Sequence, residues 1–308
     1  PAMGAMKTDG TYKGVAVMGN GTNRGLFQQN EGCVYLINLE TGKILKTLTT
    51  SNMKNVVTPV TVLKTNNDQR IEKFYAGEDN GWVYEWNQAD WDTARRIINL
   101  NGSSGPSYRM EVASFNGTPW LFIATGDFDP LVSSSSNNYL VGLNTRYAPY
   151  NNLSQFTEID PEDSDGLSSS AMGWYIVLGN KELPTTPPKL YNGFLFFSTF
   201  APDTDPCKTG VSKIYLLNAR TGYGGWGSGK KVVSLGGVKI SGITISGGKA
   251  ILGATDFSSG NFTLPSEMNN ARLRDNMLFF DVPSEVENNE GLIPSGQMIP
   301  LYWREWRP

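Results

Sequence analysis

One eight-residue pattern occurs twice in the chain and limits the folds that it can adopt. The sequence Tyr-Leu-(Ile or Leu)-Asn-x-x-Thr-Gly stands at residues 35–42 and again at 215–222. Each copy is typical of an apolar strand that runs into a turn, because its apolar residues end at Asn and Gly. A strand-and-turn unit that returns along the chain indicates a fold built from similar sheets.

Five stretches share the wider form of this pattern, in which an apolar strand is followed by a variable polar loop and a second strand with aromatic, Leu and Asn or Asp residues. They lie near 14–42, 58–87, 119–144, 194–222 and 250–282. A spacing of roughly 40–75 residues with strands alone predicts an all-β fold, a β-propeller of four-stranded antiparallel blades. We count about five blades, and we expect the stretch 298–306 (MIPLYWREW) to close the ring against the N-terminal strand. A two-sheet sandwich is the alternative, which the repeated pattern disfavours.

The stretch 58–87 shows the expected blade most clearly. Residues 58–63, 73–76 and 82–86 are rich in Val, Thr and aromatic residues and read as strands. Asn80 and Gly81 lie between the last two strands and supply the positive φ angles of a tight hairpin. These elements amount to most of one four-stranded antiparallel sheet.

Composition excludes several classes of protein. The chain has 308 residues, a net charge of −3 and a pI near 5.2, so it has no basic field for nucleic acid. No apolar run approaches the length that spans a membrane. Residues 1–6 (PAMGAM) look like an expression remnant, and we expect residues 7–308 to form a single propeller domain.

Histidine is absent and only two cysteines, Cys33 and Cys207, are present. The lack of histidine excludes Ser-His-Asp hydrolysis, histidine-ligated zinc and haem attachment. The cysteines have no CxxC spacing, so one disulfide and two buried thiols are both open.

A polar loop separates the first two strands of the 58–87 stretch. Its oxygen-bearing side chains are Asn66, Asp68 and Glu72, at spacings that a loop around a calcium ion uses. The first position, however, is Lys64, whose ammonium group cannot bind a cation.

The two eight-residue segments resemble the quinoprotein-like propeller repeat. Further segments occur in the order seen in one family, the C-terminal propeller domain of PilY-type pilus biogenesis factors. They are 17–21, 58–62, 75–81, 173–178, 202–210 and 303–305. The resemblance extends from about Gly14 to Arg307. The upstream blades of the family are missing here, which implies a shortened ring or part of a larger one.

The resemblance implies a non-catalytic extracellular protein of the type IV pilus system, either at the cell surface or in the fimbrium. Such a domain would assist pilus biogenesis or cell adhesion by binding pilus subunits, minor pilins, or a host or surface ligand. We expect a monomer without a cofactor. A quinone-cofactor dehydrogenase and a carbohydrate-binding or glycoside-hydrolysing propeller are the alternatives, although Cys33 and Cys207 are not the adjacent pair that a quinone site would use.

In the family, the loop that matches 64–72 holds calcium. Oxygen ligand types remain here at Asn66, Asp68 and Glu72, and Arg70 could offer its backbone carbonyl. The first Asp is replaced by Lys64 and the turn glycine by Gln69. We therefore predict a degenerate calcium loop that binds no metal, in which Lys64 pairs with Asp68 and Glu72. A solvated polar loop is the other interpretation.

Other groups of residues suggest sites less strongly. The acidic stretch 160–166 has Pro161 where a calcium loop would have its first Asp, and we interpret it as a solvated loop. The carboxylate pairs at 127–129 and 203–205 are typical of turns. We expect most of the eight tryptophans to fill the space between blades. The glycine-rich stretch 224–229 is predicted to be a flexible hairpin tip, and Arg95–Arg96 an exposed strand edge.

Overall fold

The computed structural model describes residues 1–282, apart from 9, 22–31, 51–52, 54–55, 57, 65–68, 79, 101–104, 107, 127–136, 164–165, 168–171, 180, 206–207, 209, 255–264, 269 and 275–276. The described residues form five β-sheets of four or five strands each. Their helices are short 3₁₀ turns, far below the length that crosses a bilayer: η1 (Thr145–Tyr147), η2 (Leu153–Gln155) and η3 (Gly227–Gly229). The fold is therefore all-β, as the sequence predicts.

Each sheet is built from strands that follow one another in the sequence. Sheet 1 contains β1 (Ala2–Thr8), β2 (Thr11–Gly19), β3 (Val34–Asn38) and β4 (Ile44–Leu48). Sheet 2 contains β5 (Thr61–Lys64), β6 (Ile71–Gly77), β7 (Trp82–Asn87) and β8 (Asp90–Asn99). Both are antiparallel with the strands in sequence order.

The remaining three sheets are variations on this order. Sheet 3 contains β9 (Glu111–Phe115), β10 (Thr118–Ala124), β11 (Tyr139–Asn144), β12 (Thr157–Glu158) and β13 (Gly173–Val177), with β12 parallel to β13 at its edge. Sheet 4 contains β14 (Leu183–Pro184), β15 (Lys189–Tyr191), β16 (Phe194–Ala201), β17 (Val211–Asn218) and β18 (Val232–Gly236). Sheet 5 contains β19 (Ile240–Ser246), β20 (Lys249–Ala254), β21 (Arg272–Arg274) and β22 (Met277–Asp281), in the order β19-β20-β22-β21.

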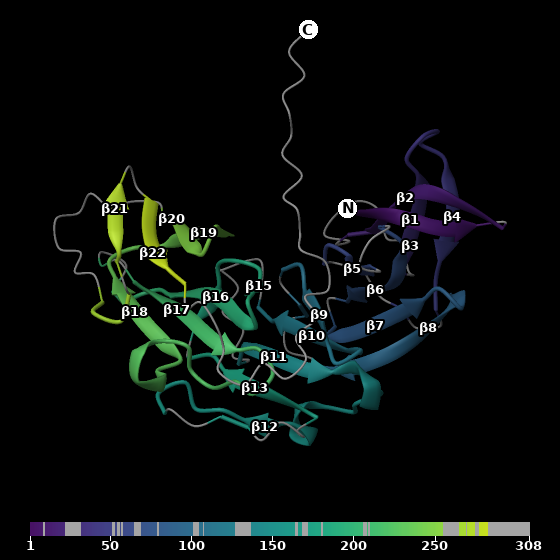
Figure 1. Ribbon diagram of the computed structural model, residues 1–308. Helices are drawn as coiled ribbons and strands as arrows, with labels where there is room; N and C mark the ends of the chain where they lie inside the picture. Colours follow the sequence, from purple (N-terminus) through teal and green to yellow (C-terminus); the bar gives the residue numbers. More distant parts are fainter. Residues whose placement is uncertain are drawn as a thin grey trace, which may run out of the picture.

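The sheets follow one another along an arc with sheet 1 and sheet 5 at its two ends (Figure 1). Sheets 1, 2 and 3 meet through their first strands, since β1 lies against β5 and β5 against β9. Sheet 3 meets sheet 4 through β9 and β15, the second strand of sheet 4. Between sheets 4 and 5 the contact is made by β16 and β19. First strands that gather on one side are consistent with a propeller-like fold.

Four hydrophobic cores lie between the five sheets, and each joins one sheet to the next. The side chains of β16 show how this arises. Phe194 and Phe196 pack toward sheet 5, whereas Leu195 and Phe197 pack toward sheet 3. Successive side chains of a strand point to opposite faces, so an uninterrupted apolar run predicts a strand that is buried on both sides. Tryptophans contribute to these cores as expected: Trp86, Trp91, Trp120, Trp174 and Trp226 are buried.

The repeated eight-residue pattern forms the same turn in sheets 1 and 4. The side-chain oxygen of Asn38 accepts hydrogen bonds from the backbone N–H groups of Glu40 and Thr41, at 2.8 and 3.0 Å. The oxygen of Asn218 accepts the equivalent bonds at 3.0 and 3.1 Å. The final glycine of each copy has a φ of 68°, a left-handed conformation that favours glycine. Both copies of the pattern therefore form a turn of the same geometry.

Several expectations can be placed on this fold. The predicted strands of 58–87 correspond to β5, β6 and β7, and Gly81 has the predicted positive φ, at 91°. Residues 2–6 form most of β1, whether or not they derive from expression, and Met6 is fully buried. The proposed closing stretch 298–306 and Cys207 lie outside the described residues, while Cys33 is a buried free thiol.

Candidate functional site

The loop at 64–72 connects the first two strands of sheet 2. Lys64 ends β5 and lies opposite Ile71 on β6. The register shifts between Leu63 and Lys64, so Glu72 has no residue opposite it and forms a β-bulge. Asn66 and Asp68, two of the predicted oxygen ligand types, lie outside the described residues.

Lys64 and Gln69 close this loop. The Lys64 ammonium donates a hydrogen bond of 2.6 Å to Oε1 of Gln69. Gln69 itself has a φ of 60°, a left-handed conformation that costs a residue with a side chain about 1–2 kcal/mol. The turn thus keeps the backbone shape that a glycine would favour, although glycine is absent. Lys64 therefore has a neutral amide as a partner in the described part of the loop. Its predicted ion pair with Asp68 involves a residue outside the described ones and stays a prediction.

The other end of the loop is attached to sheet 1. The carbonyl oxygen of Gln69 accepts a hydrogen bond of 2.9 Å from the backbone N–H of Ala5. The Arg70 guanidinium lies 4.5 Å from the centre of the Tyr12 ring. These contacts join β1 and β2 of sheet 1 to the residues directly before β6 of sheet 2. The first position of the predicted calcium loop carries the Lys64 ammonium, which cannot ligate a cation.

A group of four charged side chains lies beside this loop, where β5, β9 and β15 come together. Its members are Lys64, Arg109, Glu111 and Lys189. The Thr61 hydroxyl on β5 donates a hydrogen bond of 2.6 Å to the carbonyl oxygen of Met110, just before β9. Burial lowers the pKa of Lys64, and the nearby positive charge of Arg109 lowers it further. The sequence analysis did not identify Arg109 as part of a site, because an exposed arginine between strands carries no distinctive signal.

Glu111 is the carboxylate of this group and begins β9. Burial raises its pKa to about 7, although the charges of Lys189 and Arg109 and a backbone hydrogen bond from Leu190 act in the opposite direction. Lys189 and Leu190 belong to β15, so this carboxylate bridges sheets 3 and 4. The sequence signal that could have identified Glu111 is a charged residue at the start of a largely apolar strand.

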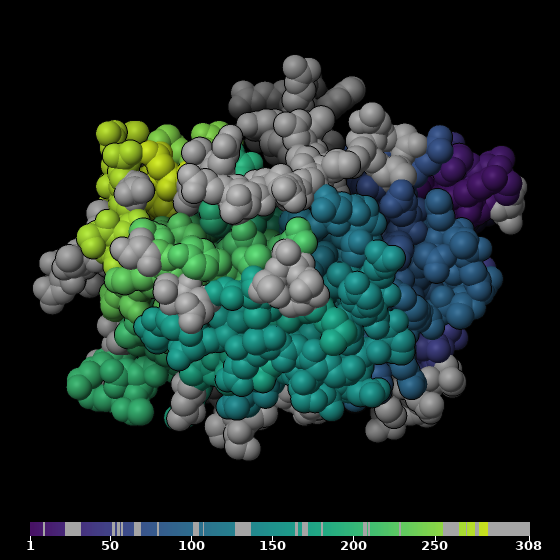
Figure 2. All heavy atoms as spheres, turned by 60° about the horizontal axis from the view of Figure 1, so that its bottom comes forward, coloured from purple at the N-terminus to yellow at the C-terminus, as the bar shows by residue number. Residues whose placement is uncertain are grey.

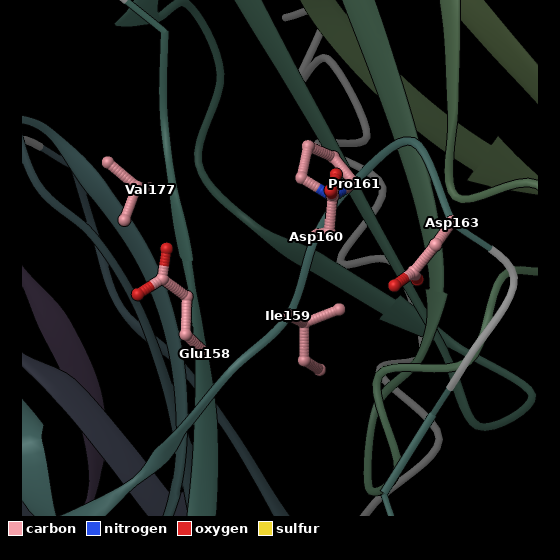
Figure 3. Close-up of a pocket in the computed structure, with 6 residues that line it drawn as sticks. All are labelled: Glu158, Ile159, Asp160, Pro161, Asp163 and Val177. Atoms are coloured by element: carbon pink, nitrogen blue, oxygen red, sulfur yellow. The ribbon is translucent and has the colours of Figure 1, made fainter.

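An acidic groove of about 510 Å³ lies along the edge of sheet 3 (Figure 3). It is lined by Glu158, Ile159, Asp160, Pro161, Asp163 and Val177. Each carboxylate is held from within the protein. Glu158 accepts from the Tyr175 hydroxyl at 2.9 Å, Asp160 accepts from the N–H of Glu162 at 2.9 Å, and Asp163 pairs with Lys231, which is fully buried.

These contacts refine the prediction for the acidic stretch. Asp163 forms an ion pair with buried Lys231, directly before β18 of sheet 4, so this part of the loop is attached to sheet 4 and is not merely solvated. Among the described residues, no three Asp, Glu or Cys side chains are placed to hold a metal ion. The groove is thus a structural junction with an acidic surface.

The most completely bonded carboxylate is Glu182, which is buried between sheets 3 and 4. Its side chain accepts hydrogen bonds from Thr199 at 2.5 Å, Tyr215 at 2.8 Å, Lys213 at 3.0 Å and the backbone N–H of Gly179 at 3.1 Å. Burial alone would raise the pKa of Glu182, but these hydrogen bonds and the charge of Lys213 together lower it. The residue ties the connection between β13 and β14 to strands β16 and β17 of sheet 4.

Two minor predictions have different outcomes. Arg95 and Arg96 lie on β8, an edge strand of sheet 2, and Arg96 is exposed as predicted. Arg95 in addition forms an ion pair with buried Glu85 at 3.0 Å and donates to the Thr145 carbonyl at 2.8 Å. The stretch 224–229 is not a flexible tip, because Trp226 is buried and donates to the Ile214 carbonyl at 3.3 Å. A side chain at Gly224 would meet backbone atoms at 2.0 Å, so glycine there allows close packing.

The structure tests one of the two predictions for carboxylate pairs. Oδ1 of Asp203 accepts a hydrogen bond of 2.9 Å from the N–H of Asp205, which is the turn geometry that the sequence suggests. Asp127 and Asp129 lie outside the described residues.

Comparison with solved structures supports the fold. The chain is similar to the crystal structure of the Pseudomonas aeruginosa PilY1 C-terminal domain, with a TM-score of 0.56 and 14% sequence identity, over 86% of this chain and 71% of that one. A computationally designed protein, Ika8, gives a TM-score of 0.31 at 12% identity over 89% of this chain and 85% of that one, which is too low to carry an argument. No protein-family model and no curated protein matches the sequence. The structural likeness shows a PilY1-like fold.

Proposed function

We propose that this chain is a non-catalytic β-propeller domain that acts by binding in the biogenesis or adhesion of type IV pili. Its partners are pilus subunits, minor pilins, or a host or surface ligand, and it works outside the cell as a monomer. The observation that carries the proposal is the PilY1-like succession of sheets. The order of the short motifs listed above supports the same family.

The buried tryptophans favour this proposal over a carbohydrate-binding propeller. A sugar site commonly presents exposed aromatic rings, whereas five of the tryptophans fill the space between sheets. Trp82, which is half-buried, lies under the Arg96 guanidinium at 4.7 Å.

Deletion of the coding sequence in a bacterium that carries it tests the proposal. We expect fewer surface pili or weaker surface attachment, restored by the wild-type gene. Binding of the purified protein to purified pilins would identify the partner, with a glycan array and a quinone-reduction assay as controls for the two alternatives. Unaltered pili and attachment, together with a positive result in either control, would refute the proposal.

The degenerate calcium loop is a separate part of the proposal. Calorimetric titration of calcium into chelator-treated protein is expected to show no heat from this loop in the wild type. A variant with Lys64→Asp and Gln69→Gly removes the competing cation and restores a glycine at the left-handed position, so it should bind. Calcium binding by the wild type that a Lys64→Asp change does not strengthen would show that the loop is not a site in which lysine replaces the ion.

A further inference from the structure

Two cations near the meeting point of β5, β9 and β15 form no ion pair with any described residue. They are Arg109, which Met110 separates from β9, and Lys189, which begins β15. The ion pairs of the described residues are made by other cations: Lys46, Lys73, Arg95, Lys213, Lys230, Lys231 and Lys249. Arg109 is exposed and Lys189 half-buried, so both charges can act on an anion from solution.

Contacts between strands hold the two cations near each other. The hydrogen bond of 2.6 Å from the Thr61 hydroxyl to the Met110 carbonyl fixes the residues before β9 against sheet 2. On its other side, β9 lies against β15. The three strands lie on the inner side of the arc (Figure 1), and sheet 3 lies in the middle of the molecule between sheets 1 and 5 (Figure 2).

Glu111, on β9, shows that both charges reach one carboxylate. Burial raises its pKa to about 7, while the positive charges of Lys189 and Arg109 act in the opposite direction. The carboxylate also accepts a hydrogen bond from the backbone N–H of Leu190. A carboxylate from a ligand at the same surface would be attracted by the same two cations.

The strands packed against β9 add no second acid to this group. β5 carries Lys64 as its one charged residue, β15 carries Lys189, and β10 carries none. The other titratable side chains in these segments are Tyr108, whose pKa burial raises, and Tyr191. In the described part of the group, three cations therefore stand against one carboxylate.

We propose that Arg109 and Lys189 bind a carboxylate of an acidic segment in a partner protein, and that a proton on Glu111 strengthens this binding. That the ligand is a protein rests on the binding role proposed above. An ionised Glu111 competes with the ligand for the two cations, whereas a protonated Glu111 leaves them to the ligand.

The overall charge of the chain favours a short acidic segment over a long polyanion. A net charge of −3 and a pI near 5.2 give no extended basic field that would hold nucleic acid. Two or three neighbouring cations are enough to pair with one or two carboxylates. The local positive group is thus matched in size to a few acidic side chains.

Titration calorimetry at pH 6 and pH 8 tests the site, with acetylated tetraglutamate amide as the probe. Glutamate is ionised at both pH values, and the protein has no histidine to titrate between them. We expect the wild type to bind about three- to tenfold more tightly at pH 6. Tetraglutamine amide should not bind. Equal affinity for tetraglutamate at the two pH values, or equal binding of the two peptides, would overturn the proposal.

Variants with matched charge assign the binding to these residues. Arg109→Met combined with Lys189→Met should weaken binding at pH 6 by about tenfold or more. Lys43→Met combined with Arg272→Met removes the same charge from exposed positions in sheets 1 and 5, and should change the affinity less than about twofold. Glu111→Gln should bind at pH 8 about as tightly as the wild type does at pH 6. Such a gain cannot result from misfolding. Equal losses in the two double variants, or an unchanged pH dependence in Glu111→Gln, would refute the site.

The titrations contain no pili, so they separate this site from the proposed pilus role. Peptide binding with the expected pH dependence, together with unaltered pili in the deletion strain, would support the site and count against the pilus role. Altered pili without peptide binding would refute the site and leave the pilus role in place.

Discussion

Two carboxylates at the junction of sheets 3 and 4 have pKa values that are shifted in opposite directions. Glu182 accepts four hydrogen bonds from within the chain, including one from the Lys213 ammonium, and its pKa is lowered. Glu111 has a single backbone hydrogen bond and two cations in its surroundings, and burial raises its pKa to about 7. Burial acts on both residues, and the number of donors decides which effect dominates.

The two residues therefore give the junction opposite responses to pH. The stabilisation from Glu182 is present above the unfolded-state pKa of about 4.3 and is lost as the pH falls through the lower folded-state pKa. The contribution of Glu111 is fully present below about 4.3, where the group is neutral in both states, and is lost as the pH rises toward 7. Sheets 3 and 4 should hold together best in mildly acidic solution.

Removal of the Glu182 side chain should have the largest effect. In Glu182→Ala the Lys213 ammonium loses its counter-charge, and the Thr199 and Tyr215 hydroxyls lose their acceptor. We expect the free energy of unfolding at pH 7 to fall by about 3–5 kcal/mol. Urea unfolding measures this change. Glu158→Ala, which removes a carboxylate at the exposed edge of sheet 3, is the control and should cost less than about 1 kcal/mol. Equal losses in the two variants would show that the bonded network contributes nothing.

Replacement of Glu111 should act in the other direction and only at high pH. Glu111→Gln removes a carboxylate that is costly to ionise, so the variant should be more stable than wild type at pH 8, by roughly 1–3 kcal/mol. At pH 4 the wild-type side chain is neutral, and the two proteins should unfold at nearly the same urea concentration. A difference that is the same at both pH values would contradict the raised pKa.

The sequence predicts the framework of this junction but not its chemistry. Alternation and apolar runs predict strands such as β16, because burial on both faces leaves a clear pattern in the residues. The Asn38 and Asn218 turns are likewise predicted, since their hydrogen bonds are local. Glu182 and its donors Thr199, Lys213 and Tyr215 are distant in the sequence and come together only when the sheets pack. The pairing of Arg95 with Glu85 was missed for a different reason: the two residues lie opposite each other on β7 and β8, and the register of these strands shifts at two places that the sequence pattern does not reveal.

Removal of one donor should sharpen the comparison between the two carboxylates. Thr199→Val keeps the shape of the side chain but deletes the hydroxyl that donates to Glu182 at 2.5 Å. We expect the protein to lose about 1–2 kcal/mol, because the remaining donors still hold the carboxylate. A pH series of urea unfolding curves should also show an acid-induced loss that is smaller than in wild type and complete at a higher pH, as the folded-state pKa of Glu182 rises toward its ordinary value. An acid-induced loss of unchanged size would mean that this hydroxyl does not contribute to the lowered pKa.

The smallest effect on stability is expected from Lys189→Met, which removes a cation beside Glu111. Its positive charge favours the ionised carboxylate, so the pKa of Glu111 should rise further above 7 when the charge is removed. Lys189 is half-buried, and a charge pair of this kind changes stability by only about 0–1 kcal/mol. Titration of the Glu111 carboxyl by NMR measures the pKa directly, and Lys213→Met provides the parallel test on Glu182. If both changes raise the pKa of the neighbouring carboxylate, the same electrostatic rule acts at both positions. The opposite pKa shifts of Glu111 and Glu182 in the wild type then follow from the additional hydrogen-bond donors of Glu182, which Glu111 lacks.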